Sequence, residues 1–468
     1  MKYNLLQQDI EILKQSSKEL YSRIELLNRN KKILANIEGD LISDSISIDA
    51  ESDIRRTYSC EMSFSKSNWN NASKYKLMTY YICPYVGIEH IRLNEILWYK
   101  LGTFAFDSRN FTYNESNTSI NIQCLDLMSY MNGTLGGELK DIKIEIEAGN
   151  NIRNVIISLL EECGITEYNI CEMTRTIPSD KEYSSTTYYA IIKELLDLYA
   201  GYEMYFDVDG IFTIDEIPTC QYDENIIDDT IIEPLLISQS GSFSYEGIYN
   251  HVKVYGMNIE TDRYTEQCTY TDNVYNATIE TMTTYENFET YSIKLPQANL
   301  ENAKLNINNI GAKNIVKDDG VLLNANDVSA EVYSFRYRRL TDDFLLLGQY
   351  QVVGEAWDTN SESPFNKDNL GYEIYHECSG GEYEKIYTNE LANQRARYEI
   401  WLSTNIKNNM TLEMMFIPWL DVNTKISYTD KETKETSSYI IKRINGSFMD
   451  ATMTIEIIKF YENYPNII

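Results

Sequence analysis

The chain has 468 residues, of which 43% are hydrophobic, while glycine (21) and proline (8) are scarce. This composition supports hydrophobic cores and several domains, and it excludes fibrous, collagen-like and disordered classes. The formal net charge is −30, with 71 acidic and 41 basic residues, which excludes broad phosphate neutralisation as a way of binding nucleic acid. Two alternatives fit the charge: a soluble acidic surface, or an acidic channel wall that repels DNA.

Sorting signals and cysteine motifs are not evident in the sequence. The eight cysteines are scattered without CxxC or paired Cys/His spacing, so we expect neither a zinc site nor a disulfide framework. The N-terminal sequence MKYNLLQQDIEILKQ is rich in acids and glutamines, unlike a signal peptide. No apolar run reaches the ~18 residues that span a membrane. We expect cytosolic folding, reduced thiols and no membrane insertion.

Residues 1–20 predict an amphipathic helix, because apolar residues between Leu6 and Leu20 recur at helical spacing. This helix either lies on its own domain, which we favour, or contributes a coiled-coil seam. The sequence NRNK, Asn28–Lys31, predicts a turn between RIELL and KILANI. Residues 1–35 are therefore expected to hold a helix and the first hairpin strand.

Residues 36–145 predict a β-rich domain. Strands are expected at Thr57–Phe64, Glu95–Ser108 and Thr118–Leu127, which are rich in β-branched and aromatic residues. The glycine-rich segment Gly133–Gly137 lacks the ending and context of a phosphate-binding loop. We interpret this segment as a linker that follows the β-rich domain.

Four charged residues lie close together in the sequence of this first domain: Asp49, Asp53, Arg55 and Arg56. Such a cluster could suggest a catalytic site. Salt bridges at a subunit contact, or a solvated loop, explain the residues better. We therefore predict Arg55 and Arg56 as interface or barrel-end residues.

Residues 146–240 change character and predict a small inserted α+β domain. The sequence NIRNVIISLLEECG predicts a helix that ends at Gly164, and a second helix is expected over Thr186–Gly201. Asp209-Gly210 then joins two alternating segments, which is the strongest short signal for a β-hairpin. The same hairpin explains Asp207-Val208-Asp209-Gly210 better than a calcium loop, whose glycine comes later.

Residues 241–468 predict a second β-rich domain that includes helices. A strand is expected at His251–Gly256, and Ile259–Thr290 has no apolar period, which favours a long polar excursion over about residues 259–320. We expect this excursion to be a hairpin arm or a mobile loop. Asn324–Leu340 predicts a helix, capped by Asn326 or Asp327.

The C-terminal part predicts a helix that leads into antiparallel strands. Thr388–Asn405 keeps helical spacing without glycine or proline, and Met410–Ile417 then alternates as a strand does. Pro418 cannot donate to a ladder and marks the strand end. Leu420–Asn423 is expected to turn the chain into a further strand.

Catalytic signatures are not found. The three histidines lie outside metal-binding spacings, and His376-Glu377-Cys378 are adjacent, so that on a strand they point to opposite faces. Acidic pairs are unavoidable among 71 acids, and a GxSxG elbow is not present. We therefore predict no catalytic residue, no cofactor and no metal. Trp419, in the turn Pro418-Trp419-Leu420-Asp421, is expected to fill a barrel end or a subunit contact.

Three C-terminal segments carry a family resemblance: LANQRARYEIWL, IPWLDVNTKISY and YIIKRINGSFMDATMTIEIIKFY. With Arg23–Phe64 and Gly241–Gly256, these segments resemble hub proteins of bacteriophage tails, over about three quarters of the chain. The resemblance implies a mainly β fold with an α+β insertion: two tube-forming β-barrel-like domains plus a small inserted α+β domain.

The same resemblance implies a structural virion protein. Three chains would form a pseudo-sixfold ring that joins the hexameric tail tube to a threefold spike or fibre, at the distal end of the virion tail. The ring would close the tube until DNA passes through its acidic lumen without specific binding. Its partners would be other copies of the chain, a distal tail or tube protein, and a spike or fibre protein, assembled in the host bacterial cytoplasm.

Two other functions are kept as alternatives. The first is a tail-associated cell-wall hydrolase or endopeptidase, although the chain stops at Ile468 directly after the last expected strand and leaves no room for a further domain. The second is a saccharide-binding module that recognises a receptor through tyrosine and tryptophan surfaces. Cell-wall clearing and glycan binding would support these alternatives respectively.

Overall fold

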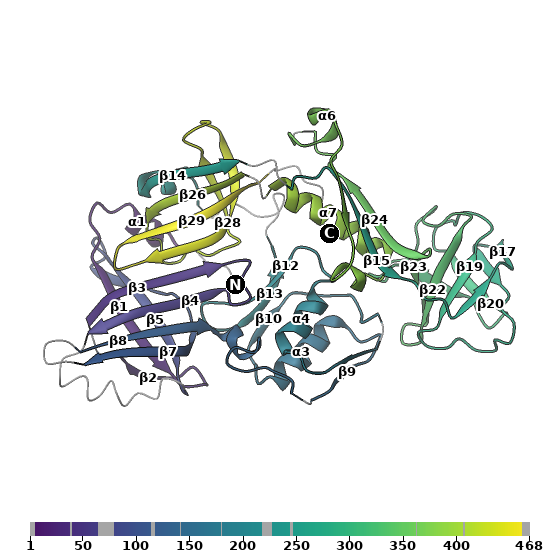
Figure 1. The fold of residues 1–468 in the computed structure, drawn as a ribbon, viewed down its shortest axis with the longest axis horizontal. Coiled ribbons are helices and arrows are strands. Elements are labelled where there is room, and N and C mark those ends of the chain that lie inside the picture. Colours follow the sequence, from purple (N-terminus) through teal and green to yellow (C-terminus); the bar gives the residue numbers. More distant parts are fainter. Residues whose placement is uncertain are drawn as a thin grey trace.

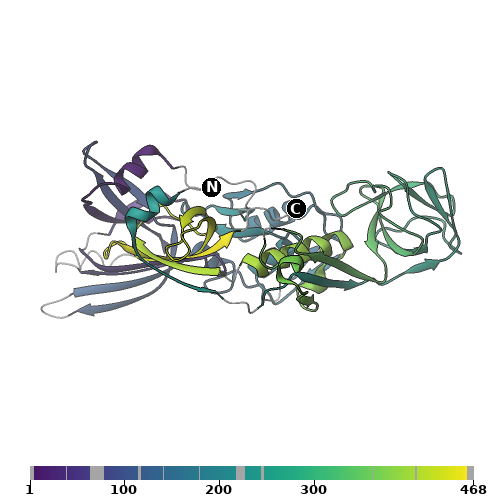
Figure 2. The ribbon, with the colours of Figure 1, turned by 90° about the horizontal axis from the view of Figure 1, so that it is seen from above.

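The computed structural model describes residues 5–37, 40–63, 79–113, 118–140, 142–178, 180–217, 227–243, 247–361, 363–405 and 408–460. Residues 1–4 of the expected first helix, Phe64 and Cys220 lie outside this part of the chain. The described part is an elongated, mainly β molecule. Figure 1 shows a large sheet at one end, an α+β unit and a helix in the middle, and a separate β unit at the other end. Figure 2 shows the same order from above.

A 13-stranded sheet forms the large end of the molecule, and both ends of the chain contribute to it. In spatial order its main path is β14 (Leu236–Phe243), β26 (Asn408–Met415), β29 (Thr452–Phe460), β28 (Thr436–Ser447), β3 (Asp40–Asp49), β4 (Arg56–Ser63), β8 (Thr118–Asp126), β7 (Phe104–Tyr113), β5 (Tyr81–His90), β1 (Leu20–Leu27) and β2 (Ile33–Asn36). β6 (Glu95–Lys100) pairs with β5, and β27 (Lys425–Thr429) pairs with β28.

The N-terminal helix is shorter than predicted. α1 covers Gln7–Leu13, and β1 begins at Leu20. The prediction was wrong beyond Leu13, because residues 14–19 form a turn and bends and half-buried Leu20 pairs in the sheet as the first residue of β1. The turn at Asn28–Lys31 is confirmed: the N–H of Asn28 donates to Lys32 O at 2.9 Å, between β1 and β2.

The strands of the predicted second hub domain, 241–468, do not form one sheet. β26 to β29 join the N-terminal strands, because β28 pairs with β3 through Arg443 opposite Asp49 and Ile444 opposite Ile48. The remaining strands of this range form two other sheets. The sheet therefore crosses the sequence limits expected for the two barrel-like domains, 36–145 and 241–468.

An α+β unit lies largely within residues 146–240, where one was predicted, although β9 (Ile144–Ile146) begins earlier and β14 belongs to the large sheet. It contains two helices, α3 (Ile152–Glu162) and α4 (Tyr188–Leu196), and two small sheets. One sheet joins β10 (Tyr168–Ile170), β13 (Phe212–Glu216) and β12 (Tyr202–Phe206), and the other joins β9 (Ile144–Ile146) and β11 (Lys181–Tyr183).

Local signals placed most of this unit correctly. Gly164 follows α3 with a φ of 83°, and Gly210 turns the hairpin between β12 and β13 with a φ of 72°. Asp207 Oδ1 accepts the N–H groups of Asp209 and Ile211, both at 2.9 Å, so the turn itself satisfies this aspartate. α4 ends five residues before the predicted Gly201, because residues 197–201 form a turn.

A three-stranded sheet and a long helix connect the two ends of the molecule. The sheet has the order β24 (Gln351–Trp357), β15 (His251–Asn258) and β25 (Tyr375–Cys378). α7 (Asn389–Asn405) packs against it (Figure 1), which confirms the helix predicted over Thr388–Asn405. Two short turns of helix, α6 (Lys367–Leu370) and η4 (Tyr383–Lys385), flank β25.

Residues expected to form a polar excursion instead form part of an eight-stranded, barrel-like sheet with its own core. Its order is β16 (Arg263–Thr265), β19 (Thr290–Lys294), β22 (Val332–Arg338), β23 (Asp343–Gly348), β21 (Lys313–Val316), β20 (Lys304–Ile307), β18 (Val274–Ala277) and β17 (Cys268–Thr271). Tyrosines supply much of the buried surface there, including Tyr275 and Tyr291.

The helix predicted over Asn324–Leu340 is wrong. Residues 332–338 are β22, and its side chains alternate so that Phe335 and Tyr337 enter the core. Asn326, which we expected to cap a helix, has a φ of 67° and lies in a turn. Side-chain burial in a sheet overrode the apparent capping signal.

The short helices that remain adjoin the ends of strands in the large sheet. η2 (Leu127–Tyr130) follows β8, while α5 (Asp229–Ile232) and η3 (Glu233–Leu235) precede β14. The core on one face of the large sheet contains alternate residues of β3, β4, β8, β26, β28 and β29. The other face of these strands is polar.

Candidate functional site

The polar face belongs to a run of eight neighbouring strands, β14, β26, β29, β28, β3, β4, β8 and β7, all paired antiparallel. Strand residues alternate between two faces. Ile46, Tyr58, Ile122, Leu412 and Ile455 point into the core, so the residues between them point away from it. The run brings β3, β4, β7 and β8 onto one wall with β14, β26, β28 and β29 from later in the chain.

Small polar side chains dominate this wall. The residues that alternate with the core, here called the polar wall, are Ser238, Ser240, Ser242, Thr411, Glu413, Thr452, Thr454, Glu456, Arg443, Asn445, Ser447, Ser43, Ser45, Ser47, Asp49, Thr57, Ser59, Glu61, Ser63, Ser119, Asn121, Gln123, Ser108 and Asn110. Most of them carry a hydroxyl or an amide group and no charge.

Contacts between strands confirm that these side chains share one face. Ser47 Oγ donates to Asn445 Oδ1 at 2.7 Å, and Ser108 Oγ donates to Gln123 Oε1 at 3.1 Å. The one basic residue of the polar wall, Arg443, donates to both Asp49 and Glu456 at 2.9 Å. Its charge is therefore balanced within the wall, which presents no surplus cation to a phosphate.

The six residues predicted as interface or barrel-end residues come from two segments, and the structure brings three of them close to one another: Arg55, Arg56 and Asp421. Arg56 donates to the carboxylate of Asp421 and, at 2.7 Å, to Phe206 O. Arg55 pairs with Glu203 and lies over the ring of Tyr205 at 3.9 Å. This buried junction therefore joins the large sheet, β12 of the α+β unit and the turn before β27. Its subunit-contact role stays a prediction.

The turn that contains Pro418, Trp419 and Leu420 packs against the core of its own chain. Trp419 is 7% exposed and Leu420 is 5% exposed, and both belong to the core of the large sheet. Pro418 follows the end of β26, as predicted. Within the chain these residues seal one end of the strand layer, while Asp421 reaches Arg56.

Electrostatics at the junction favour tight ion pairing. Burial alone would lower the pKa of Arg55, but the carboxylates of Glu203 and Asp421 raise it above the ordinary value. Beside it, Asp126 is 2% exposed and accepts the N–H groups of Arg56 and Met128, each at 2.9 Å. Burial raises the pKa of Asp126 to about 6, although these two hydrogen bonds oppose the shift.

Replacing Asp126 by Asn should change the pH dependence of stability. Because the pKa rises from 3.8 to about 6 on folding, ionised Asp126 costs the folded state about 3 kcal/mol above pH 6. This cost is absent below about pH 4 and grows between about pH 4 and pH 6. From pH 4 to pH 7, we therefore expect the free energy of unfolding of Asp126→Asn to rise by about 3 kcal/mol relative to that of the wild type. Urea unfolding of both proteins at the two pH values measures this change. A difference that stays constant with pH would contradict the raised pKa.

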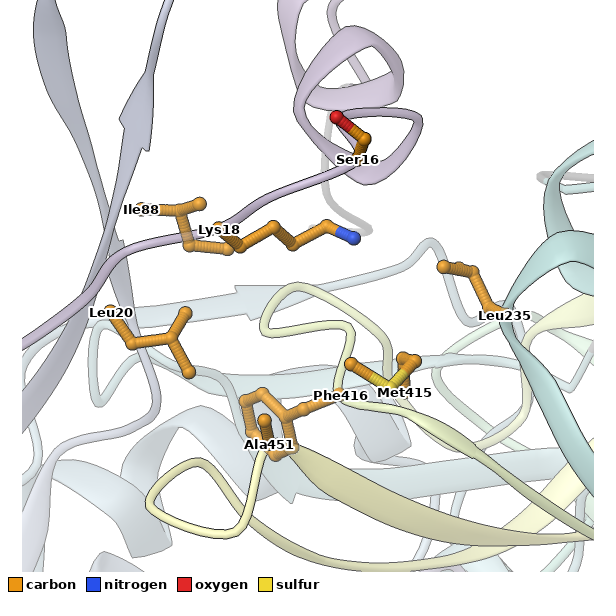
Figure 3. Close-up of a pocket in the computed structure, with 8 residues that line it drawn as sticks. All are labelled: Ser16, Lys18, Leu20, Ile88, Leu235, Met415, Phe416 and Ala451. Atoms are coloured by element: carbon orange, nitrogen blue, oxygen red, sulfur yellow. The ribbon is translucent and has the colours of Figure 1, made fainter.

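A cavity of about 150 Å³ lies between the N-terminal strands and the C-terminal strands. Figure 3 shows Lys18 extending across it, above an apolar floor formed by Leu20, Phe416 and Ala451. Burial lowers the pKa of Lys18. A site of this size has room for one apolar side chain.

In the described ranges, no group of three or more His, Cys, Asp or Glu residues could hold a metal ion. His376 stacks on Tyr249 with ring centroids 3.9 Å apart, and Cys378 is buried. Glu377, which lies between them on β25, is exposed, so it points to the other face of the strand, as predicted for His376-Glu377-Cys378. Over the same ranges, no helix has the length and apolar character needed to cross a membrane.

Sequence reasoning missed the polar wall, although a signal for part of it exists. Ser43, Ser45, Ser47 and Asp49 alternate with buried residues along β3, and Thr57, Ser59, Glu61 and Ser63 do so along β4. The alternation can be read within each strand. That the strands form one wall depends on pairing between segments about 400 residues apart, such as β28 with β3.

Comparisons with known proteins identify the fold. A family model described as a domain of unknown function, DUF5048, matches residues 362–464, and no curated protein sequence matches the chain. The crystal structure of the 43 kDa tail protein of prophage MuSo2 from Shewanella oneidensis shares 12% identity, with a TM-score of 0.52, and covers 94% of this chain and 98% of its own.

A second solved structure gives the same result. The tail protein from Neisseria meningitidis MC58 shares 7% identity, with a TM-score of 0.50, and covers 95% of this chain and 98% of its own. At such low identity the similarity concerns the fold alone. Over nearly its whole length, the chain has the fold of these phage tail proteins.

Proposed function

We propose that the chain is a structural protein of a phage or phage-derived tail, and that three copies form the hub at the distal end of the tail. The observation that carries this proposal is the polar wall, which is continuous across eight strands and is built from both ends of the chain. The fold shared with the two tail proteins supports the same role.

In this proposal the polar wall of each copy faces a central channel. Each chain brings two groups of four strands to the wall, β14, β26, β29 and β28 from one part of the chain and β3, β4, β8 and β7 from the other. Three chains thus supply six similar groups, which is the symmetry needed to continue a hexameric tube. The other side of the ring keeps threefold symmetry for a spike or fibre protein. A closed ring keeps the assembly finite.

DNA passage through the channel follows from the chemistry of the wall. Hydroxyl and amide groups exchange hydrogen bonds with water and with phosphate without holding either. The paired Arg443 offers no surplus positive charge, so the counterion release that drives tight DNA binding is not available. The wall is thus better described as hydroxyl-rich with a small excess of acids than as densely acidic. Its role is structural and not catalytic.

The solution mass of the full-length chain tests the proposal. We expect a trimer of 3 × 54.4 = 163.2 kDa, measured by light scattering after size exclusion, because each copy exposes sheet edges that a ring would cover. Particle images of that species should show a central opening. A monomer over the full concentration range would contradict self-assembly, and hydrolysis of host cell wall would contradict a purely structural role.

A further inference from the structure

A lysine, an asparagine and a glutamate meet at the buried junction between the large sheet and the α+β unit. Lys442 Nζ donates to Asn423 Oδ1 at 3.1 Å, and Asn423 Nδ2 donates to the carboxylate of Glu203. Asn423 is 2% exposed, and the side chain of Glu203 is 9% exposed. The side-chain amide of Asn423 therefore contacts an amine through its oxygen and a carboxylate through its nitrogen, at a site shielded from most water.

The backbone holds Lys442 and Asn423 opposite each other. β27 and β28 pair antiparallel with Lys425 opposite Ile440, and the same register, continued by two residues, places Asn423 opposite Lys442. The N–H of Asn423 donates to Ile441 O at 2.7 Å, which fixes this register beyond the end of β27. The contact between the amine and the amide is therefore set by strand pairing and does not depend on a chance meeting of long side chains.

A β-bulge directs Lys442 toward the junction. Ile441 and Arg443 pair with consecutive residues of β29, so Lys442 is an extra residue without a partner on that strand. Bulges re-aim side chains and are common next to active sites. Arg443 remains on the polar wall, where it pairs with Asp49, while the preceding Lys442 extends to Asn423. The irregularity in β28 thus has a local effect, which is to bring an amine to the amide.

The charges of the junction prepare Lys442 as a nucleophile. Burial lowers the pKa of Lys442, and the positive charge of Arg55 also lowers it, whereas the carboxylates of Glu51 and Glu203 oppose the shift. The amine is therefore neutral more often than that of an exposed lysine, and the neutral amine is the nucleophilic form. Glu203 forms an ion pair with Arg55, so it presents a carboxylate that can accept a proton.

We propose that the chain joins Lys442 to Asn423 through an isopeptide bond, without help from another protein. Lys442 Nζ attacks Asn423 Cγ and forms the new C–N bond, and the bond between Cγ and Nδ2 breaks. Glu203 takes one proton from the attacking nitrogen and passes it to Nδ2, which leaves as ammonia. One amide replaces another, so the step needs no oxidant, reductant or cofactor. The fixed contact supplies the high effective concentration that such an attack requires.

The bond ties the turn before β27 to β28 and closes a loop between residues 19 positions apart in the sequence. Such a crosslink restricts the unfolded chain as a disulfide does, but reducing agents do not cleave it. The same turn carries Asp421, which accepts from Arg56 of β4. The crosslink therefore strengthens the junction between the large sheet and the α+β unit. It forms within one chain and does not depend on the proposed trimer.

The intact mass of the full-length chain tests the crosslink. We expect the wild type to weigh less than its sequence by the mass of one ammonia. Incubation at about pH 9 should complete the loss, because a larger share of the amine is then neutral. Trypsin should release the peptide Asn408–Lys425 joined to the peptide Glu435–Arg443, and fragmentation of this pair should place the bond at Asn423 and Lys442.

Two variants assign the roles of the side chains. Lys442→Arg is the matched control, because it keeps a positive donor beside Asn423 but has no amine that can attack, and it should retain its full mass. Glu203→Gln keeps an acceptor oxygen for Arg55 but cannot carry the proton, and it should lose ammonia about a hundredfold more slowly or less readily still. The crosslinked wild type should also unfold at a higher urea concentration than Lys442→Arg.

The full sequence mass in folded wild type after this incubation would overturn the proposal. An asparagine can also lose ammonia by closing to a cyclic imide on its own backbone, and Asn445 before Gly446 is a site where this can occur. Loss of ammonia that persists in Lys442→Arg, without joined peptides, would indicate that reaction and would also overturn the proposal. Loss at the wild-type rate in Glu203→Gln would overturn the proton transfer assigned to Glu203.

Discussion

Replacing Arg56 by Ala should lower the free energy of unfolding by about 2–4 kcal/mol, through a lost buried hydrogen bond and a cavity. Arg56 is 1% exposed and donates to Asp421 and to Phe206 O. Without the guanidinium, the backbone carbonyl of Phe206 loses its buried donor, whereas the Asp421 carboxylate, whose side chain is 34% exposed, can bind water instead. The variant also leaves an unfilled volume beside the core, which adds to the loss.

The location of Arg56 makes the effect extend beyond a single contact. The residue lies on β4 in the large sheet, Phe206 on β12 of the α+β unit, and Asp421 in the turn that follows β26. One side chain thus links three segments that are distant in the sequence. We therefore expect Arg56→Ala to weaken trimer formation as well, because the two halves of the polar wall lose a fixed relation.

Arg443 offers the matched control, since it is also a paired arginine of the large sheet. It is half-buried on the polar wall and pairs with Asp49 and Glu456. Ion pairs with solvent access contribute little, about 0–1 kcal/mol. Urea unfolding of Arg56→Ala and Arg443→Ala beside the wild type measures both effects. Equal losses in the two variants would contradict the role assigned to burial.

The sequence predicted the elements whose signals are local. α7 has no glycine or proline and begins within one residue of the predicted start, while Gly210 marked the hairpin of β12 and β13. In each case the information lies within a few neighbouring residues, where capping, turn geometry and periodicity act. The strand end at Pro418 is a further example, because the missing N–H is a property of that residue alone.

The elements that failed depend on distant partners. The segment 259–320 has no apolar period, yet Tyr275, Tyr291 and Leu305 fill a core that tyrosines from separate strands build together. In a hydrophobicity pattern tyrosine is read as a polar residue, but in a core its ring fills space as an apolar residue does. Hydrophobic periodicity therefore fails to detect strands whose core residues are tyrosines. β22 was misread for the same reason, since its core residues Phe335 and Tyr337 alternate with serine and arginine.

The candidate site also depends on pairing between residues that are distant in the sequence. Arg56 and Asp421 were both predicted as contact residues, but no local signal indicates that they pair with each other across 365 residues. The polar wall likewise depends on the order of strands within the sheet. Alternation shows which side chains share a face within one strand, and topology decides which strands share a wall.

Replacing Gly354 by Ala should destabilise the protein by about 3 kcal/mol or more, because overpacking of this kind forces backbone shifts. A Cβ atom at Gly354 would lie 2.0 Å from Ala392 C and 2.2 Å from Asn393 N, both in the backbone of α7. Flexible side chains can move away from an added methyl group, but the backbone of a 17-residue helix cannot do so locally. The helix as a whole must shift away from β24. That shift stretches the bonds from Val353 and Glu355 to Asn389 and Asn393, and so exposes the edge that α7 protects.

Gly136→Ala is the matched control, because a Cβ atom there would meet Tyr130 O at 3.4 Å and Tyr130 Cα at 3.9 Å, which are ordinary contacts. Urea unfolding should show a large loss for Gly354→Ala and a change within about 0.5 kcal/mol for the control. The exposed β24 edge adds a second readout, since an unprotected edge recruits other chains. We expect Gly354→Ala to form assemblies larger than the trimer, seen by light scattering, at concentrations where the wild type forms none. Wild-type stability and mass in this variant would show that α7 does not need close contact with β24 to cover its edge.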